Sequence, residues 1–192
     1  WSISSSGSSV PDGPSGTTAG CLHQGDCMRW MWIDTVFSFE LGRRMVAVKN
    51  VSLAEEHLHD HLPGSPVMPA SLMIEGFAQT AGILVGASRG FEEKVILAKI
   101  AVATVERDVV PGQCVRYDAT IERMDSMGAS TKGTIERFDH RSGVWEPIGR
   151  VEMIFSHLDQ NRSGIVFPEE NFVFGENFRA ILRASGLDRF LK

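Results

Sequence analysis

The stretch Asp60–Gln79 reads DHLPGSPVMPASLMIEGFAQ, and the rest of the chain is interpreted around it. Its second residue is a histidine, His61, after which it passes three prolines and continues into an apolar segment with one carboxylate, Glu75. Pro69 suits the first turn of a helix, because its fixed φ fits there and its missing N–H is not needed. The segment Ala70–Ser88 is apolar around most of its circumference. This pattern predicts a buried helix about 28 Å long at ~1.5 Å per residue.

Three features of this stretch suggest acid–base chemistry. A carboxylate in an apolar helix is costly unless it is paired, hydrogen-bonded or protonated, and a protonated carboxyl group can act as a general acid. The alternatives for Glu75 are a structural carboxylate with a buried partner and one that points out at a gap in the packing. His61 lies just before the helix and can accept a proton near neutral pH. The helix N-terminus offers free N–H groups that would stabilise negative charge on a carbonyl oxygen.

The composition is that of an ordinary globular protein. The chain has 192 residues, of which 43% are hydrophobic and 22% are charged, enough for one domain with extensions. Its net charge of −5 argues against a general nucleic-acid binder, which usually has a basic excess. The segment 70–87 is interrupted by Glu75, Gln79 and several glycines, so we expect no membrane span.

Cysteine usage indicates a reducing compartment. Cys21, Cys27 and Cys114 make an odd count without the spacing of a disulfide framework. No basic segment followed by an apolar core is visible at the start, so a cytoplasmic location is expected. Cys21, His23 and Cys27 could hold a metal, but no fourth ligand is near them, and a solvated tail is the favoured interpretation.

Two further patterns leave a metal alternative open. His57, His59 and His61 would share one face of a strand, but no acidic or thiol ligand accompanies them at ligand spacing. Residues 159–164 with Glu170 match the calcium loop of an EF-hand, although a proline interrupts the loop, and a plain polar turn is the alternative. We therefore expect neither a metal nor a cofactor.

The chain divides into three parts. Residues 1–28 are rich in Ser, Gly and Thr and are expected to be disordered, because they cannot bury enough apolar surface to offset the entropy of ordering. Residues 29–157 form the expected folded domain. Residues 158–192 form a tail with a short helix at 177–185, whose apolar face is expected to cover part of the sheet or a subunit joint.

Strand patterns surround the predicted helix. The segment 30–39 suits a short helix or strand, and 54–60 suits a loop. β-Branched and alternating apolar residues predict strands at 45–51, 94–107, 114–124, 128–138 and 147–157. One buried helix beside about five strands, most of them consecutive, predicts an α+β fold with a largely antiparallel sheet wrapped on the helix.

The central stretch resembles the signature of the FabZ type of 3-hydroxyacyl-acyl-carrier-protein dehydratases. It has the histidine, then Pro-Val-Met-Pro, then a glutamate fourteen residues after the histidine, then Ala-Gln. The flanking segments 48–51 and 110–113 also look like those of the family, and the resemblance covers about residues 30–157. Asp60, Leu62 and Ala70 depart from it, because the family has glycine, phenylalanine and glycine at these positions.

The resemblance implies a hot-dog fold, in which a long sheet wraps a central helix. It also implies a dimer with sites shared between subunits, or a trimer of such dimers. The implied activity is a hydro-lyase reaction without a cofactor: loss of water from (3R)-3-hydroxyacyl thioesters on acyl carrier protein, giving trans-2-enoyl thioesters in fatty-acid or related synthesis. A hot-dog acyl thioesterase, a coenzyme A-linked enoyl hydratase and a non-catalytic acyl-binding member remain alternatives.

The resemblance assigns roles to particular residues. His61 would take the proton beside the thioester carbonyl, and Glu75 would protonate the departing hydroxyl. The backbone N–H of Ala70 would stand at the oxyanion position, and Gln79 would help to hold Glu75. The pocket wall would include Leu62, Pro69 and Met73. An acidic carrier protein further suggests a basic patch near the mouth of the pocket, formed by Arg89, Lys94 and Lys99.

Overall fold

The computed structural model describes residues 31–158 and 174–187. In these residues it has six strands and three helices. The strands are β1 (Thr35–Glu40), β2 (Arg44–Asn50), β3 (Lys94–Val105), β4 (Cys114–Met124), β5 (Gly128–Asp139) and β6 (Val144–Leu158). The helices are α1 (His57–Asp60), α2 (Ala70–Ser88) and α3 (Glu176–Ala184). The predicted disorder of residues 1–28, the Cys21–Cys27 cluster and the calcium-loop pattern at 159–170 lie outside the described residues.

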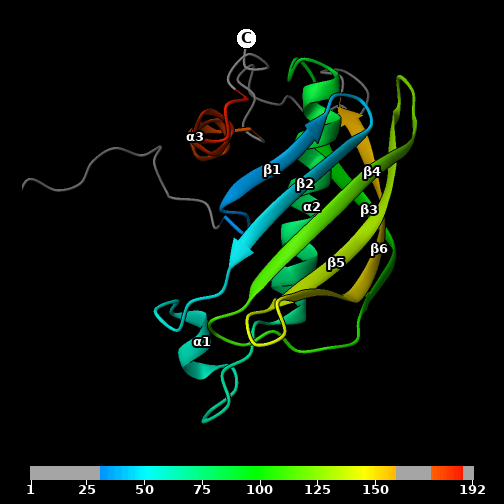
Figure 1. Cartoon of the computed structure of the whole chain (residues 1–192). Helices are drawn as coiled ribbons and strands as arrows, with labels where there is room; N and C mark the ends of the chain where they lie inside the picture. Colours follow the sequence, from blue (N-terminus) through cyan, green and yellow to red (C-terminus); the bar gives the residue numbers. More distant parts are fainter. Residues whose placement is uncertain (1–30, 159–173, 188–192) are drawn as a thin grey trace, which may run out of the picture.

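A single antiparallel sheet curves around α2 (Figure 1). The strand order is β1-β2-β4-β5-β6-β3, and every neighbouring pair is antiparallel. The helix lies along the inner face of the sheet, and α3 lies beside β1 (Figure 1). This is the hot-dog arrangement of the α+β class, so the predicted fold is confirmed.

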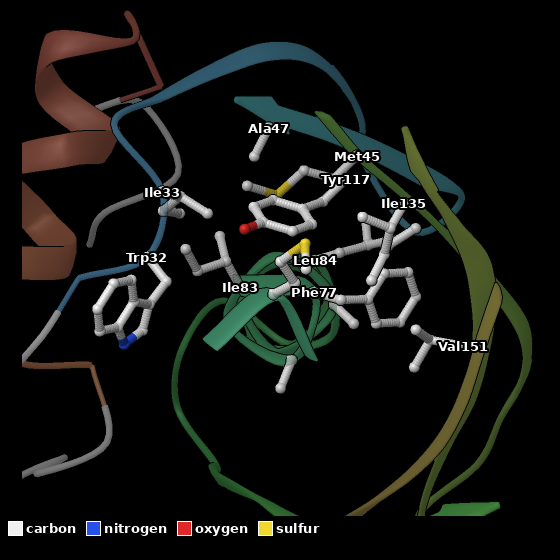
Figure 2. Packing of buried hydrophobic residues seen from close by; sticks show 14 of the residues in the cluster. Trp32, Ile33, Met45, Ala47, Phe77, Ile83, Leu84, Tyr117, Ile135 and Val151 are labelled. Atoms are coloured by element: carbon white, nitrogen blue, oxygen red, sulfur yellow. The ribbon is translucent and has the colours of Figure 1, made fainter. Parts of the chain in front are cut away.

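Alternation along the strands explains how the sheet covers the helix. In β4, Val115, Tyr117 and Ala119 are fully buried, while the residues between them are only partly buried. Because successive strand side chains point to opposite faces, one apolar row faces α2 and the other row faces outward. Figure 2 shows Tyr117 and neighbouring strand residues packed over Phe77 and Leu84 of the helix.

The structure corrects two predicted segments. Residues 54–60 were expected to be a loop, but His57–Asp60 form the short helix α1. The last strand begins at Val144 and not at Pro147, so a proline lies inside it. The pairing shifts where Glu136 faces Pro147 and Ile135 faces Gly149. A proline is accommodated in a strand at such an irregularity because its missing N–H breaks the regular hydrogen-bond ladder.

By length and composition alone, helix α2 could cross a membrane. Its apolar composition is explained instead by its burial inside the protein. It is a candidate span over Ala70–Ser88, and 72% of the apolar window is buried inside the protein. The sheet and not lipid therefore provides the apolar environment of this helix.

Tyr117 of β4 lies directly against α2 at Gly76. A Cβ atom on Gly76 would overlap the Tyr117 ring, so only glycine lets the ring lie against the helix. The Tyr117 side chain is fully buried, and its hydroxyl has no hydrogen-bond partner among the described residues. Burial raises the pKa of Tyr117, because the low-dielectric core disfavours the phenolate.

The variant Tyr117→Phe should be more stable than the wild type by about 1 kcal/mol at neutral pH, since a buried unpaired hydroxyl is costly. The difference should grow above about pH 10, where this tyrosine ionises in the unfolded chain but stays neutral in the folded one. Urea unfolding of both proteins at neutral pH and above about pH 10 measures this difference in stability. Gly76→Ala, which forces a methyl group into the same ring, should instead destabilise the protein. A Tyr117→Phe variant that is less stable than the wild type would show that the Tyr117 hydroxyl forms a hydrogen bond in the folded protein.

Candidate functional site

Glu75 lies on the side of α2 that the sheet leaves open. Its neighbours Gly76 and Phe77 are buried, but Glu75 itself is exposed. The prediction of a carboxylate enclosed within a buried helix is therefore wrong for the single chain. Glu75 instead matches the alternative interpretation, a carboxylate that points out at a gap in the packing. At the position four residues further along the helix, Gln79 Nε2 donates a hydrogen bond to Glu75 Oε1 over 3.0 Å.

Gln79 is itself held in place from another part of the chain. The backbone N–H of Trp32 donates to Gln79 Oε1 over 2.8 Å. Because this oxygen accepts from Trp32, the amide NH₂ group must face Glu75. The Gln79 side chain is almost fully buried, so this orientation is enforced by packing as well. Sequence reasoning missed Trp32, because a backbone N–H leaves no side-chain signal in the sequence.

His61 stands at the end of α1, in a turn closed by backbone hydrogen bonds. The Val67 N–H donates to the His61 carbonyl over 2.9 Å, and His61 Nδ1 lies 2.9 Å from the Val67 carbonyl oxygen. A carbonyl can only accept, so Nδ1 carries the hydrogen in this arrangement. In the neutral ring, Nε2 then has its lone pair free to accept a proton.

A second histidine, His57, packs beside this turn. Its ring meets the Trp32 ring edge-on, with the centroids 5.0 Å apart. Burial lowers the pKa of His57, and the neighbouring side chains of Lys49 and His61 lower it further against the opposing effect of Glu55. His57 therefore favours its neutral form, which keeps an additional positive charge away from His61.

A single chain does not bring His61 and Glu75 into contact. In the described part of the chain, no hydrogen bond or ion pair joins them: His61 binds Val67, and Glu75 binds Gln79. Each chain thus presents a fixed imidazole and a fixed carboxylate as separate groups.

Ala70 begins α2 and is exposed. The first hydrogen bonds of the helix run from the N–H groups of Leu72 and Met73 to the Pro69 carbonyl. The N–H groups of Ala70 and Ser71 precede these bonds, and among the described residues no side-chain hydrogen bond caps this end of the helix. Such N–H groups can stabilise an anionic oxygen.

An apolar cavity of about 270 Å³ lies beside Glu75. Its wall on α2 also includes Ala78, Gln79, Gly82 and Ile83, and the other walls come from Val95 and Leu97 of β3, Phe155 of β6, and Phe174 and Phe178 at α3. Pockets that bind small molecules are typically about 300–1,000 Å³ and mostly apolar, with a few polar groups. The cavity is thus small, with one carboxylate and one amide in an otherwise apolar lining.

The three residues predicted for the pocket wall lie outside the cavity beside Glu75. Leu62 is 54% exposed on the turn after His61, Pro69 is half-buried at the start of α2, and Met73 is buried in the core. None of them lines the cavity beside Glu75. Their contact with a substrate stays a prediction.

The structure bears on two further predictions, the histidine metal site and the basic patch. His57 and His59 lie on helix α1, so the premise that three alternate histidines share a strand face is wrong. Residues 31–158 and 174–187 contain no cluster of three or more metal-ligating side chains. Of the three residues predicted for a basic patch, Lys94 is buried, Arg89 is partly buried and donates to the Asp125 carbonyl, and Lys99 is exposed.

Comparison with protein families gives a match over most of the described chain. The sequence model described as the FabA-like domain matches residues 28–139. The 3-hydroxyacyl-acyl-carrier-protein dehydratase FabZ of Listeria monocytogenes serotype 4b is 37% identical over 110 residues, covering 56% of this chain and 76% of that protein. The protein of the same name from a Hydrogenobaculum species is 37% identical over 105 residues, covering 53% of this chain and 71% of that protein.

Solved structures of low sequence identity share the fold. A chain of the dehydratase heterocomplex ApeI:P from Xenorhabdus doucetiae aligns with a TM-score of 0.55 and 14% identity, covering 68% of this chain and 84% of that one. A conserved protein from Pseudomonas aeruginosa aligns with a TM-score of 0.52 and 16% identity, covering 65% and 87%. At these identities the similarity shows the fold alone.

Replacement of Gln79 by leucine should cost about 1–3 kcal/mol of stability, because the buried Trp32 N–H loses its acceptor. Glu75→Gln should cost much less, since the Glu75 side chain is exposed and an amide oxygen can still accept from Gln79. Urea unfolding of both variants tests this difference. Equal losses would show that the Trp32–Gln79 hydrogen bond contributes little to the fold.

Proposed function

The chain belongs to the FabA-like domain family, and on this premise we propose that it removes water from 3-hydroxyacyl thioesters carried by acyl carrier protein, giving trans-2-enoyl thioesters for fatty-acid synthesis. The FabZ relatives support this proposal, because they are dehydratases matched over most of their length. The observation that carries it is the Glu75 carboxylate, held by Gln79 at the side of a small apolar cavity. We place the reaction in the cytoplasm, in agreement with the cysteine usage.

The proposed mechanism uses one base, one acid and one oxyanion site. His61 Nε2 removes a proton from the carbon next to the thioester carbonyl, and the electron pair left behind forms the new carbon–carbon double bond. The bond from the next carbon to its hydroxyl breaks, and the Glu75 carboxyl group supplies the proton with which that hydroxyl leaves as water. The N–H of Ala70 stabilises the negative charge that develops on the thioester oxygen. No cofactor takes part in these steps.

We further propose that two copies of the chain share each site, since no hydrogen bond or ion pair joins His61 and Glu75 within the described part of one chain. Strand β3 is suited to pairing with a second copy, because it is the last strand of the sheet and only β6 pairs with it among the described strands. Leu97 and Ile100 on this edge are 40% and 44% exposed. Edge strands normally carry charges that prevent pairing, and here Lys99 is the one exposed charge within β3.

Activity should depend on both groups. Hydration of a trans-2-enoyl thioester, followed by loss of its absorbance, should fall about 10²–10⁴-fold in kcat/KM for His61→Ala and for Glu75→Gln. His59→Ala is the matched control, since this side chain is exposed and hydrogen-bonds to the Leu53 carbonyl, and it should keep wild-type activity. Full activity in either site variant would refute the acid–base pair. Release of free thiol in place of hydration would identify a thioesterase.

Two inactive variants should restore activity together if the site is shared. Mixing and refolding His61→Ala with Glu75→Gln would produce mixed dimers with one intact site, and about a quarter of wild-type activity should return. Ile100→Arg should separate the copies by placing like charges across the paired edges, as measured by sedimentation. Val144→Arg, at another exposed apolar position, is the control and should remain a dimer. A monomeric wild type, or a mixture without activity, would contradict the shared site.

A further inference from the structure

We infer that Phe174 and Phe178, from the C-terminal segment, close the far end of the acyl cavity and restrict the enzyme to short and medium acyl chains. This inference rests on the proposed function, because it assigns the cavity beside Glu75 to the acyl chain of the substrate.

The cavity runs along one face of α2. Its lining there includes Glu75, Ala78 and Gly82, which are three or four residues apart and therefore share a side of the helix. Glu75 and Gly82 are separated by about 10 Å along the helix axis at ~1.5 Å per residue. Glycine at position 82 keeps this path wide, and an added Cβ would lie 3.6 Å from Phe155 Cε1.

Phe174 blocks the path beyond Gly82. Its ring lies against Gly86, where a Cβ atom would overlap it, and it is only 4% exposed. Phe91 meets it edge-on at a centroid distance of 4.8 Å, and Phe178 does so at 6.0 Å. Because rings packed in this way cannot move aside without losing these contacts, the two phenylalanines form a firm end wall.

Helix α3 is anchored independently of the cavity. The Val36 N–H of β1 donates to the Ser185 hydroxyl oxygen over 2.9 Å, and Leu182 and Leu187 are buried. Phe178 is only partly buried. Truncating Phe178 should therefore open the cavity and leave α3 in place.

The end wall comes from outside the part of the chain that defines the family. The matched domain covers residues 28–139, and both phenylalanines lie after it. The catalytic stretch and the wall that limits the chain length thus belong to different segments, which meet only in the folded protein.

The available length sets the substrate class. An extended chain advances about 1.2 Å per bond, since three backbone bonds of a residue span ~3.5 Å. The ~10 Å between Glu75 and Gly82 therefore accepts about eight bonds of acyl chain. A hexadecenoyl chain would have to displace the phenylalanines, and an octenoyl chain would not.

The test compares trans-2-butenoyl, trans-2-octenoyl and trans-2-hexadecenoyl thioesters with the full-length protein. The wild type should prefer octenoyl over hexadecenoyl by about tenfold or more in kcat/KM, and Phe178→Ala should remove most of this preference. Ile181→Ala is the matched control, since Ile181 is a partly buried residue of α3 that does not line the cavity. It should leave the ratio unchanged. Gly82→Ala should narrow the cavity and lower activity on octenoyl relative to butenoyl.

A binding experiment separates this inference from the proposed function. Octyl and hexadecyl pantetheine thioethers, which cannot react, are titrated calorimetrically into the wild type and into Phe178→Ala. A gain in hexadecyl binding on truncation supports the end wall even if no thioester is turned over, in which case the dehydratase proposal alone fails. Equal binding and turnover of both chain lengths by the wild type would overturn the inference. So would an equal change in Phe178→Ala and Ile181→Ala.

Discussion

The burial of α2 against the concave face of the sheet is the interaction on which the rest of the structure depends. A largely apolar helix is stable in water only when its surface is covered, and the curved antiparallel sheet covers most of it. Close approach requires small residues, as at Gly76 under Tyr117 and at Gly133 of β5 under Phe77. The position of Glu75 follows from which side of this helix the sheet leaves open.

The open side of α2 carries the charged side chain of the helix, Glu75. Glu75 is exposed there, while residues 76–81, which follow it along the helix, are buried. Its orientation depends on a relay in which the Trp32 backbone holds Gln79 and Gln79 holds Glu75. A segment far from the helix in sequence therefore determines the direction of the carboxylate. The stability of the fold and the geometry of the site are linked through this buried hydrogen bond.

The same face of α2 changes character along its length. Near its start the helix offers free N–H groups and the carboxylate, and further along it offers small apolar residues beside the cavity. Chemistry and chain recognition are thus separated along one rigid element, which suits a substrate with a reactive head and an apolar tail. The aromatic rings at α3 complete the second region, and β3 borders it from the side.

The sequence by itself determined the helix at 70–88, the positions of most strands and the α+β class, and it led to the proposal of His61 and Glu75 as the catalytic pair, because periodicity, prolines and motif spacing are local properties. It did not show that Glu75 is exposed, that Trp32 orients Gln79, that Lys94 is buried, or that Phe174 and Phe178 border the cavity. Each of these depends on what a side chain meets across the fold. A sequence pattern says which face of an element is apolar, but only the tertiary structure decides what that face contacts.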